Sequence, residues 1–359
     1  MAGISAYQEY QDRRYFGSLD GVRAISILAV LWHHSPSFNP GAEPLMVLNR
    51  GFLGVDLFFV LSGFLITTLL LREEARDGRF SLAGFYKRRA LRILPVYFLL
   101  VTLLAAYYVW FRGQAEYAPL VPYYYFFLAN FLNADIPLLA PTWSLSVEEQ
   151  YYLVWPLVLL VSLKFRQMRG WLLLLAIMFF AGVQQWGMWP GPIETAHATW
   201  AWPGGAYQAI LLGSLLAVTL HSRHGFKWVA GIIHARIMPV ALLSLLLALL
   251  QLLPEDLTGW PQLLVHLVMA MFLASVVLRE DHALRPILTA LPVARLGAIS
   301  YGVYLYHLIG LDLTSRVLAM LGLDGILGTS LITIGYVLVT IVIAEISFRT
   351  YERYFLSLK

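Results

Sequence analysis

Residues 19–36 read LDGVRAISILAVLWHHSP, an apolar run of the membrane-helix type that carries Arg23 near its start and His33 and His34 near its end. Charged and titratable side chains are costly inside a bilayer, and their presence there marks function. Arg23 and His34 are eleven residues apart, so a helix places them within ~20° of the same face and ~16 Å apart along its axis. One face of the predicted helix therefore carries a cation at one end and an imidazole at the other.

The composition of the whole chain is that of a membrane protein. Of its 359 residues, 59% are hydrophobic and 13% are charged, whereas about 25% are charged in an average soluble domain. Many apolar runs reach the ~20 residues that a helix needs to cross a bilayer. We therefore predict an all-α, polytopic membrane protein in which residues 1–359 form a single transmembrane domain. The polar N-terminal region predicts no cleavable signal peptide. The absence of cysteine excludes disulfides, thiolate metal sites and a cysteine nucleophile.

The apolar runs predict about ten transmembrane helices. They lie at 19–38, 51–71, 93–111, 146–163, 170–187, 205–221, 229–252, 261–278, 297–318 and 326–348. A shorter apolar run at 123–134 could cross the membrane or not, and the positions of the lysines and arginines indicate which. If it does not cross, nearly all the basic clusters face one side, as the positive-inside rule requires. We therefore expect both termini in the cytoplasm, a location in the inner (plasma) membrane, and residues 122–145 folded back on the outer side. Such a re-entrant or interfacial segment is tolerated where it lines a cavity.

The titratable residues of the first two spans allow two interpretations. Arg23 can snorkel to the membrane surface and a histidine can cap or pack a helix. A neutral imidazole at His34 also suits a general base that removes a proton from a hydroxyl. His33 points about 100° away on the helix and is expected to be structural. Asp56, at comparable depth on the second span, either orients the imidazole of His34 or pairs with another buried polar group.

Residues 142–152, TWSLSVEEQYY, form the densest polar cluster in the predicted outer half. Acidic residues at a helix start are favoured by the helix dipole, so capping is one interpretation. The other is a site for a hydroxyl-rich acceptor, in which Trp143 stacks on a sugar ring and Glu148 assists the base or holds a hydroxyl. Six residues are predicted to contact the acceptor: Trp143, Ser144, Glu149, Tyr152, Tyr304 and His307. Tyr304 and His307 belong to the ninth span.

The strongest basic cluster is Lys87, Arg88, Arg89 and Arg92. One interpretation is ordinary positive-inside anchoring. The other is a site for a phosphorylated ligand from the cytoplasm, because arginine binds phosphate in a bidentate manner. No phosphate-binding loop or dinucleotide fingerprint occurs. No cluster has metal-ligand spacing, so no metal is predicted.

Several of these stretches together resemble the acyltransferase 3 family of membrane O-acyltransferases. LDGVRAISILAVLWHHS carries the family's arginine and histidine at Arg23 and His34, and five further motifs follow in the family's order. These are GVDLFFVLSGFLIT, FYKRRALRILPVY, TWSLSVEEQYYLVWP, ISYGVYLYH and SFRTYERYF. The resemblance covers about residues 15–356. It implies a ten-helix bundle that transfers an acyl group, commonly acetyl from acetyl-CoA, to a hydroxyl of a glycan or sugar-bearing molecule. Residues 1–359 are expected to lack the SGNH-hydrolase-like domain that often follows in the family.

The resemblance and the residues converge on one hypothesis for the site. Acetyl-CoA or another acyl-CoA is the donor, with no permanently bound cofactor, and its expected contacts are Arg23, Lys87, Arg88, Arg89 and Arg92. His34 deprotonates the acceptor hydroxyl or first accepts the acyl group, and Glu148 or Asp56 stabilises the imidazolium. The competing hypothesis is a transporter of an acyl group or glycolipid that leaves the chemistry to a separate extracytoplasmic transferase. Beyond the lipid bilayer, no nucleic-acid partner is expected.

Overall fold

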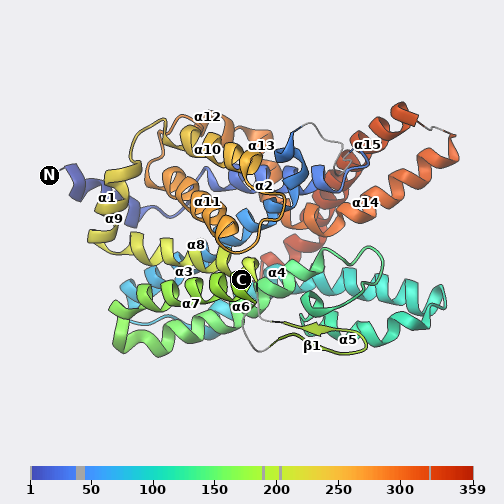
Figure 1. Cartoon of the computed structure of the whole chain (residues 1–359), viewed down its shortest axis with the longest axis horizontal. Coiled ribbons are helices and arrows are strands. Elements are labelled where there is room, and N and C mark those ends of the chain that lie inside the picture. Colours follow the sequence, from blue (N-terminus) through green and yellow to red (C-terminus); the bar gives the residue numbers. More distant parts are fainter. Residues whose placement is uncertain (1, 38–44, 188–190, 202–203, 323–324, 359) are drawn as a thin grey trace.

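The computed structural model describes residues 2–37, 45–187, 191–201, 204–322 and 325–358, and most of its long helices run along the long axis of the molecule (Figure 1). Apolar side chains on these helices form one continuous buried core. The long helices are α2 (Leu19–His33), α3 (Gly54–Asp77), α4 (Leu82–Ala105), α6 (Thr142–Val161), α7 (Arg169–Trp186), α8 (Gly205–His221), α10 (Met238–Leu252), α11 (Trp260–Leu278), α14 (Ser300–Met320) and α15 (Gly325–Ser347).

Shorter helices connect and flank them. They are α1 (Ala2–Asp12), α5 (Val121–Tyr125), α9 (Arg223–Ile233), α12 (Arg285–Leu288), α13 (Leu291–Ala298) and α16 (Arg353–Leu356). Tighter or wider helical turns occupy Met46–Leu53, Ala106–Phe111, Ala115–Leu120, Ala129–Phe131, Ser162–Met168 and Phe348–Glu352. A small antiparallel hairpin, β1 (Ile193–Glu194) and β2 (Thr199–Trp200), lies between α7 and α8.

The predicted spans coincide with helices, with two differences. The run at 229–252 is divided between α9 and α10, because Pro239 stands in the first turn of α10, where proline starts a helix. The first span ends at His33, and residue 38 lies outside the described residues. Among the described residues, five helical stretches are long and apolar enough to cross a membrane, or six if α8 and α9, bent by 108°, count as one span. The number of ten crossings therefore remains a prediction.

The basic cluster predicted to precede the third span belongs to α4 itself. Helix α3 continues to Asp77, and Gly78 reverses the chain in a left-handed conformation with φ 73°. The hydroxyl of Ser81 then caps α4 by accepting a hydrogen bond from the backbone N–H of Gly84 at 3.0 Å. The four basic residues consequently lie in the first turns of α4, so their side chains point in different directions around one helix.

Glycines allow the helices that bear the site to approach closely. A methyl group on Gly63 would collide with the backbone carbonyl of Ile210, and one on Gly213 with that of Val60, so α3 and α8 cross in direct backbone contact. Gly54 meets the backbone carbonyl of Ser26 in the same way. The glycines of α3 therefore fix its position against both α2 and α8, as small residues do in membrane bundles.

Residues 121–141 consist of short helical turns and irregular backbone. Phe127 and Leu138 have positive φ angles of 54° and 68°, which side-chain-bearing residues seldom adopt. The hydroxyl of Tyr124 accepts a hydrogen bond from the backbone N–H of Ile136 at 2.9 Å, and Leu132 pairs with Ala198 beside the β-hairpin. This segment and the hairpin lie away from the end of the molecule that holds α1 and α9 (Figure 1).

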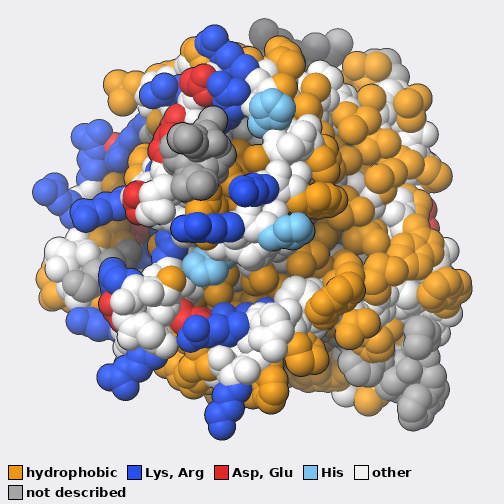
Figure 2. Space-filling view, turned by 90° about the vertical axis from the view of Figure 1, so that its left-hand side faces the viewer, with side chains coloured by type: hydrophobic (Ala, Val, Ile, Leu, Met, Phe, Trp, Pro, Cys, Tyr) orange, Lys and Arg blue, Asp and Glu red, His pale blue; other side chains and the backbone are white. Residues whose placement is uncertain are grey.

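Lysine and arginine side chains gather on that opposite end, over α1 and α9 and the neighbouring connections (Figure 2). Hydrophobic side chains cover much of the flank beside it. This separation of charge from apolar surface is the one expected for the cytoplasmic end of a membrane bundle.

Candidate active site

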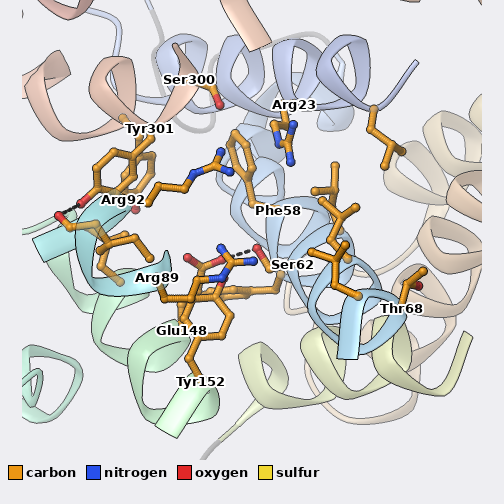
Figure 3. Close-up of a pocket in the computed structure, with 18 of the residues that line it drawn as sticks. Arg23, Phe58, Ser62, Thr68, Arg89, Arg92, Glu148, Tyr152, Ser300 and Tyr301 are labelled. Atoms are coloured by element: carbon orange, nitrogen blue, oxygen red, sulfur yellow. Dashed lines mark hydrogen bonds between the residues drawn. The ribbon is translucent and has the colours of Figure 1, made fainter. Parts of the chain in front are cut away.

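A cavity of about 340 Å³ lies between α2, α3, α4, α6 and α14 (Figure 3). Its lining carries five guanidinium groups, and Glu148 supplies the only carboxylate among the described residues that form its wall. The arginines are Arg14, Arg23, Arg72, Arg89 and Arg92. We call this space the arginine cavity. Its excess of positive charge suits an anionic ligand.

One face of α3 forms the length of the arginine cavity. Phe58, Ser62, Leu65, Leu69 and Arg72 all line it, and their spacings of four, three, four and three residues place them on the same side of a helix. From Phe58 to Arg72 the helix rises about 21 Å. The cavity is therefore a long slot, with arginine at one end and hydroxyl groups at the other.

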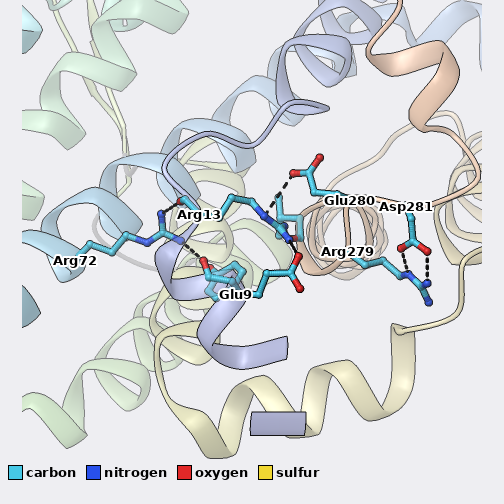
Figure 4. Close-up of polar contacts among 8 residues, drawn as sticks. Glu9, Arg13, Arg72, Arg279, Glu280 and Asp281 are labelled. Atoms are coloured by element: carbon cyan, nitrogen blue, oxygen red, sulfur yellow. Dashed lines mark hydrogen bonds and ion pairs between the residues drawn. The ribbon is translucent and has the colours of Figure 1, made fainter. Parts of the chain in front are cut away.

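The mouth of the slot is shaped by the segment that joins α1 to α2. Arg72 donates hydrogen bonds to the backbone carbonyls of Tyr10 at 2.7 Å and Arg13 at 2.6 Å, while Arg13 forms ion pairs with Glu9 at 3.1 Å and Glu280 at 3.5 Å (Figure 4). These contacts hold the segment against α3 and α11. Arg14 is consequently kept at the entrance of the arginine cavity.

Tyr15, also at this entrance, donates a hydrogen bond to the carboxylate of Asp20, which in turn pairs with Arg23. The hydrogen bond to Asp20, reinforced by partial burial, raises the pKa of Tyr15 to about 12. The phenol therefore stays protonated throughout the physiological pH range.

Within the slot, Arg89 and Arg92 stand on α4 three residues apart and point into the cavity (Figure 3). The guanidinium of Arg89 lies 4.9 Å from the centre of the Tyr152 ring. Among the described residues, neither arginine forms an ion pair with a carboxylate. Two cations are thus directed at the same space, where Glu148 supplies the one carboxylate among the described lining residues.

The predicted donor residues divide between the cavity and the surface. Arg23, Arg89 and Arg92 line the arginine cavity, as expected. Lys87 and Arg88 are exposed, and Arg88 pairs with Glu73 at 3.1 Å. Because successive residues on a helix are about 100° apart, α4 can direct only part of its basic cluster toward one cavity.

The two carboxylates expected beside His34 lie elsewhere. Asp56 accepts a hydrogen bond from Nε2 of His266 at 2.9 Å, and both side chains are buried. Glu148 accepts a hydrogen bond from the Ser62 hydroxyl at 2.6 Å inside the arginine cavity. Each carboxylate thus has a partner from another helix, and for Asp56 this is the second of the two predicted interpretations. Among the described residues neither forms a hydrogen bond with His34, so its stabilisation of the imidazolium stays a prediction.

His34 instead lies beside His307 of α14, with ring centres 4.7 Å apart and ring planes at 67°. Nδ1 of His34 is 3.0 Å from the backbone carbonyl of Val30, and Nδ1 of His307 is 2.6 Å from that of Tyr304. His33 contacts the other side of His34, at 5.1 Å between ring centres. We call His34 and His307 the histidine pair.

The predicted acceptor residues are distributed over three places. Ser144, Tyr152 and Tyr304 line the arginine cavity, and the Ser144 hydroxyl donates to the Tyr304 hydroxyl at 2.8 Å. His307 is fully buried in the histidine pair. Trp143 is 38% exposed and packs against Phe59, so it remains free for an external ligand. Glu149 is half-buried beside its neighbour Glu148.

Sequence reasoning missed several residues of the cavity, notably Ser62 and Arg72, and left open whether Tyr301 is functional or packs in the core. Ser62 and Arg72 belong to the helical face of α3 that begins at Phe58. The spacing of three and four residues along that face could have indicated them. Tyr301 donates to the backbone carbonyl of Ile93 at 2.8 Å, a contact between distant segments that has no sequence signal.

Comparison with known proteins identifies the family. Residues 16–346 match the family described as an acyltransferase domain. The chain belongs to this acyltransferase family. The matched region contains the histidine pair and the residues of the arginine cavity other than Arg14 and Tyr15.

Individual relatives match a smaller part. The peptidoglycan O-acetyltransferase OatA of Listeria monocytogenes is 36% identical over 166 residues, which are 42% of this chain and 25% of OatA. YrhL of Bacillus subtilis, provisionally named a peptidoglycan O-acetyltransferase, is 33% identical over 177 residues, 46% of this chain and 27% of YrhL. The matched region of this chain thus spans about a quarter of the length of these relatives. No solved structure matches it.

Proposed function

We propose that this protein is an integral membrane O-acyltransferase that transfers an acyl group, most simply acetyl, from cytoplasmic acyl-CoA to a hydroxyl of a glycan. The observation that carries the proposal is the placement of Arg89 and Arg92 in a slot with an excess of positive charge, whose wall reaches Tyr304 beside the histidine pair. The names of the relatives support acetyl as the acyl group and a cell-wall glycan as the acceptor class.

The arginine cavity is suited to the donor. Coenzyme A carries several phosphate groups, and guanidinium groups bind phosphate through paired, charge-assisted hydrogen bonds. The slot along α3 is about 21 Å long from Phe58 to Arg72, which accommodates an extended arm behind the phosphates. Basic side chains gather at the end of the bundle that holds α1, and Arg14 and Tyr15, which follow α1, line the cavity, so a cytoplasmic nucleotide would enter from that end.

His34 is suited to the chemistry. The carbonyl of Val30 can only accept a hydrogen bond, so Nδ1 of His34 carries the proton and Nε2 presents a lone pair. Nε2 removes the proton from the acceptor hydroxyl while the oxygen attacks the thioester carbonyl carbon. The carbon–sulfur bond then breaks, and the coenzyme A thiolate leaves with the proton that His34 held.

Tyr304 connects the two parts of the proposed site. Its side chain lines the arginine cavity, and its backbone carbonyl holds Nδ1 of His307. Ser144 and the carbonyl of Pro141 hold its hydroxyl. The reactive end of a donor in the slot therefore approaches the histidine pair at Tyr304.

The test is acyl transfer from radiolabelled acetyl-CoA by purified protein to soluble peptidoglycan fragments and to other glycans. We expect His34→Ala to lower transfer by about 10²- to 10⁴-fold, the usual contribution of a general base, with unchanged coenzyme A affinity by calorimetry. His33→Ala, one residue away, is the matched control and should stay within about threefold of wild type.

If wild type and both variants bind acetyl-CoA equally and none transfers the label to any acceptor, the enzyme proposal is wrong. A transporter working with a separate transferase would then be the better hypothesis.

A further inference from the structure

A second hollow lies on the outside of the bundle, between α6 and α7. It has a volume of about 570 Å³, and α6 lines it with Val154, Val158 and Val161, while α7 contributes Leu172. The hydroxyl of Ser162 is the one polar side-chain group in its described lining. We call this hollow the α6–α7 groove. It shares no described lining residue with the arginine cavity, so its role is a separate question.

The groove exists because the two helices diverge at their connection. Phe165 departs from helical geometry, with φ −128° and ψ 45°, in the connecting turns Ser162–Met168. Beyond them, α7 packs mainly against α8. Apolar side chains that α6 turns outward therefore remain uncovered, and Val154 and Val161 are 56% and 80% exposed. In a membrane bundle such a surface contacts lipid tails, which are as apolar as leucine.

The length of the groove fits a lipid chain. From Val154 to Ser162 the helix rises about 12 Å. The hydrocarbon of one leaflet is about 15 Å deep, half of the ~30 Å core of a bilayer. The groove is thus nearly as long as one leaflet is deep. An acyl chain lying along it would place its headgroup at the end marked by Ser162.

This end of the groove is basic. The connection between α6 and α7 carries Lys164, Arg166 and Arg169, and the sequence contains no aspartate or glutamate from 150 to 193. Basic residues beside a membrane span attract anionic headgroups. The groove therefore combines an apolar wall with a cationic end.

A carboxylate of α3 holds two of these cations without neutralising all three. Glu74 pairs with Arg169 at 2.8 Å and with Arg166 at 2.6 Å, but Arg169 is buried whereas Arg166 is 56% exposed. A guanidinium has five N–H donors, so Arg166 keeps donors for a second anion. Lys164 is exposed and forms no ion pair with another described residue. Lys164 and Arg166 are thus accessible to a phosphate.

The basic end of the groove lies at the predicted cytoplasmic end of the bundle. His221, where α8 ends, lies within electrostatic range of Arg166 and Arg169. There α8 leads into α9, which lies beside α1 (Figure 1). Lysine and arginine side chains gather over this end (Figure 2), as expected for the cytoplasmic side of a membrane protein.

We propose that the α6–α7 groove binds an anionic phospholipid of the cytoplasmic leaflet: one acyl chain lies in the groove, and Lys164 and Arg166 bind the phosphate. An apolar hollow nearly as long as a leaflet is deep, with two accessible cations at its headgroup end, favours this occupant. A zwitterionic lipid would bring an ammonium group toward the same cations and bind more weakly. The site is independent of the proposed acyl transfer.

Photo-crosslinking locates the lipid. The full-length protein in phosphatidylcholine nanodiscs receives a trace of phosphatidylglycerol with a diazirine on one acyl chain, and mass spectrometry of the digested protein identifies the labelled peptides. We expect labelling to concentrate on residues 154–172. Val158→Trp fills the groove and should remove most of this labelling. Leu175→Trp, on an exposed part of α7 outside the groove, is the matched control and should preserve it.

Native mass spectrometry measures the headgroup preference. The detergent-solubilised protein is offered equal amounts of phosphatidylglycerol and phosphatidylcholine with the same acyl chains, and wild type should retain mainly phosphatidylglycerol. Lys164→Gln should lower its preference about fivefold, the effect of one basic side chain at an anionic surface. Adding Arg166→Gln should lower the preference further. Lys227→Gln, an exposed basic position on α9, is the matched control and should stay within about twofold of wild type.

Three results would overturn the inference. Equal labelling of all exposed apolar helix surfaces would mean that only bulk lipid contacts the groove. Equal retention of the two lipids by wild type would contradict the role of Lys164 and Arg166. A dimer that survives removal of lipid and is lost in Val158→Trp would mean that a second copy of the chain covers the groove. Neither measurement uses acyl-CoA or an acceptor, so these results are distinct from failure of the proposed acyl transfer.

Discussion

The arginine cavity and the histidine pair lie at the two ends of one face of α2, and their electrostatic environments are opposite. Around Arg23 there is open space and an excess of charge, with five guanidinium groups against the carboxylate of Glu148. Around His34 the described side chains that contact the ring are those of His33 and His307, and backbone carbonyls hold the Nδ1 atoms of His34 and His307. The first environment attracts an anion, whereas the second keeps a base uncharged.

The difference explains how one bundle can bind a highly charged donor and still perform proton transfer. Arginine keeps its charge in any environment, so it remains able to bind phosphate when it lies in a cavity. An imidazole beside those arginines would be held neutral by repulsion, and its protonated form would be disfavoured at the moment of catalysis. Separation by ~16 Å along the helix weakens that repulsion.

The first prediction concerns the charged end. Arg92→Ala should raise the dissociation constant of coenzyme A about 10- to 100-fold, because it removes a charge-assisted contact with phosphate, while kcat at saturating donor changes little. Arg88→Ala is the matched control, since Arg88 lies on the same helix but pairs with Glu73 outside the cavity. Titration calorimetry with coenzyme A measures both variants.

Equal affinity for Arg92→Ala and Arg88→Ala would contradict the assignment of the cavity to the donor. Arg92→Lys refines the test. Lysine keeps the charge but loses the fork of donors, so its affinity should fall between those of arginine and alanine.

The sequence predicted the two ends of α2 better than their partners. Arg23 and His34 follow from helical period and from the cost of such side chains in a membrane, which are local properties. Their partners depend on how α2 meets α3, α4 and α14. Asp56 and His34 were expected to meet because they are at comparable depth on sequential helices, yet rotation of α3 turns Asp56 to His266 on α11. Depth can be estimated from a sequence, but rotation about a helix axis depends on packing across the whole bundle.

Glycine in an apolar helix is a local signal of close packing, because small residues let helix backbones approach, and Gly54 and Gly63 of α3 contact neighbouring backbones in this way. The cluster at 142–152 was given two interpretations, helix capping and an acceptor site. Its side chains are divided between the arginine cavity and the surface of α6 where Trp143 is exposed. A helix presents neighbouring residues to different sides, so a cluster in sequence need not be a cluster in space.

The second prediction tests whether Glu148 acts on the arginine cavity or on the base His34. Its carboxylate opposes the arginines of the cavity, so Glu148→Gln should tighten coenzyme A binding about threefold to tenfold, by removing one negative charge at partly screened distance. The amide oxygen of glutamine can still accept from Ser62. If Glu148 acts on the base instead, kcat will fall about 10²-fold without any gain in affinity. Ser62→Ala, which leaves the charge in place, is the control in both measurements.

The third and smallest effect is expected at the mouth of the cavity, where Tyr15 donates to Asp20. Since Asp20 is also held by Arg23, Tyr15→Phe should change coenzyme A affinity by less than about threefold, the range of one exposed hydrogen bond.

The pKa of Tyr15 is raised to about 12 by this hydrogen bond. A tyrosine that loses its proton would place a second negative charge beside Asp20 and weaken anion binding. Because the raised pKa delays that loss, the affinities of wild type and Tyr15→Phe should run parallel from neutral pH past the ordinary tyrosine value of 10.0. Divergence of the two curves near that value would mean that Tyr15 is not bound to Asp20 and that the entrance is organised differently.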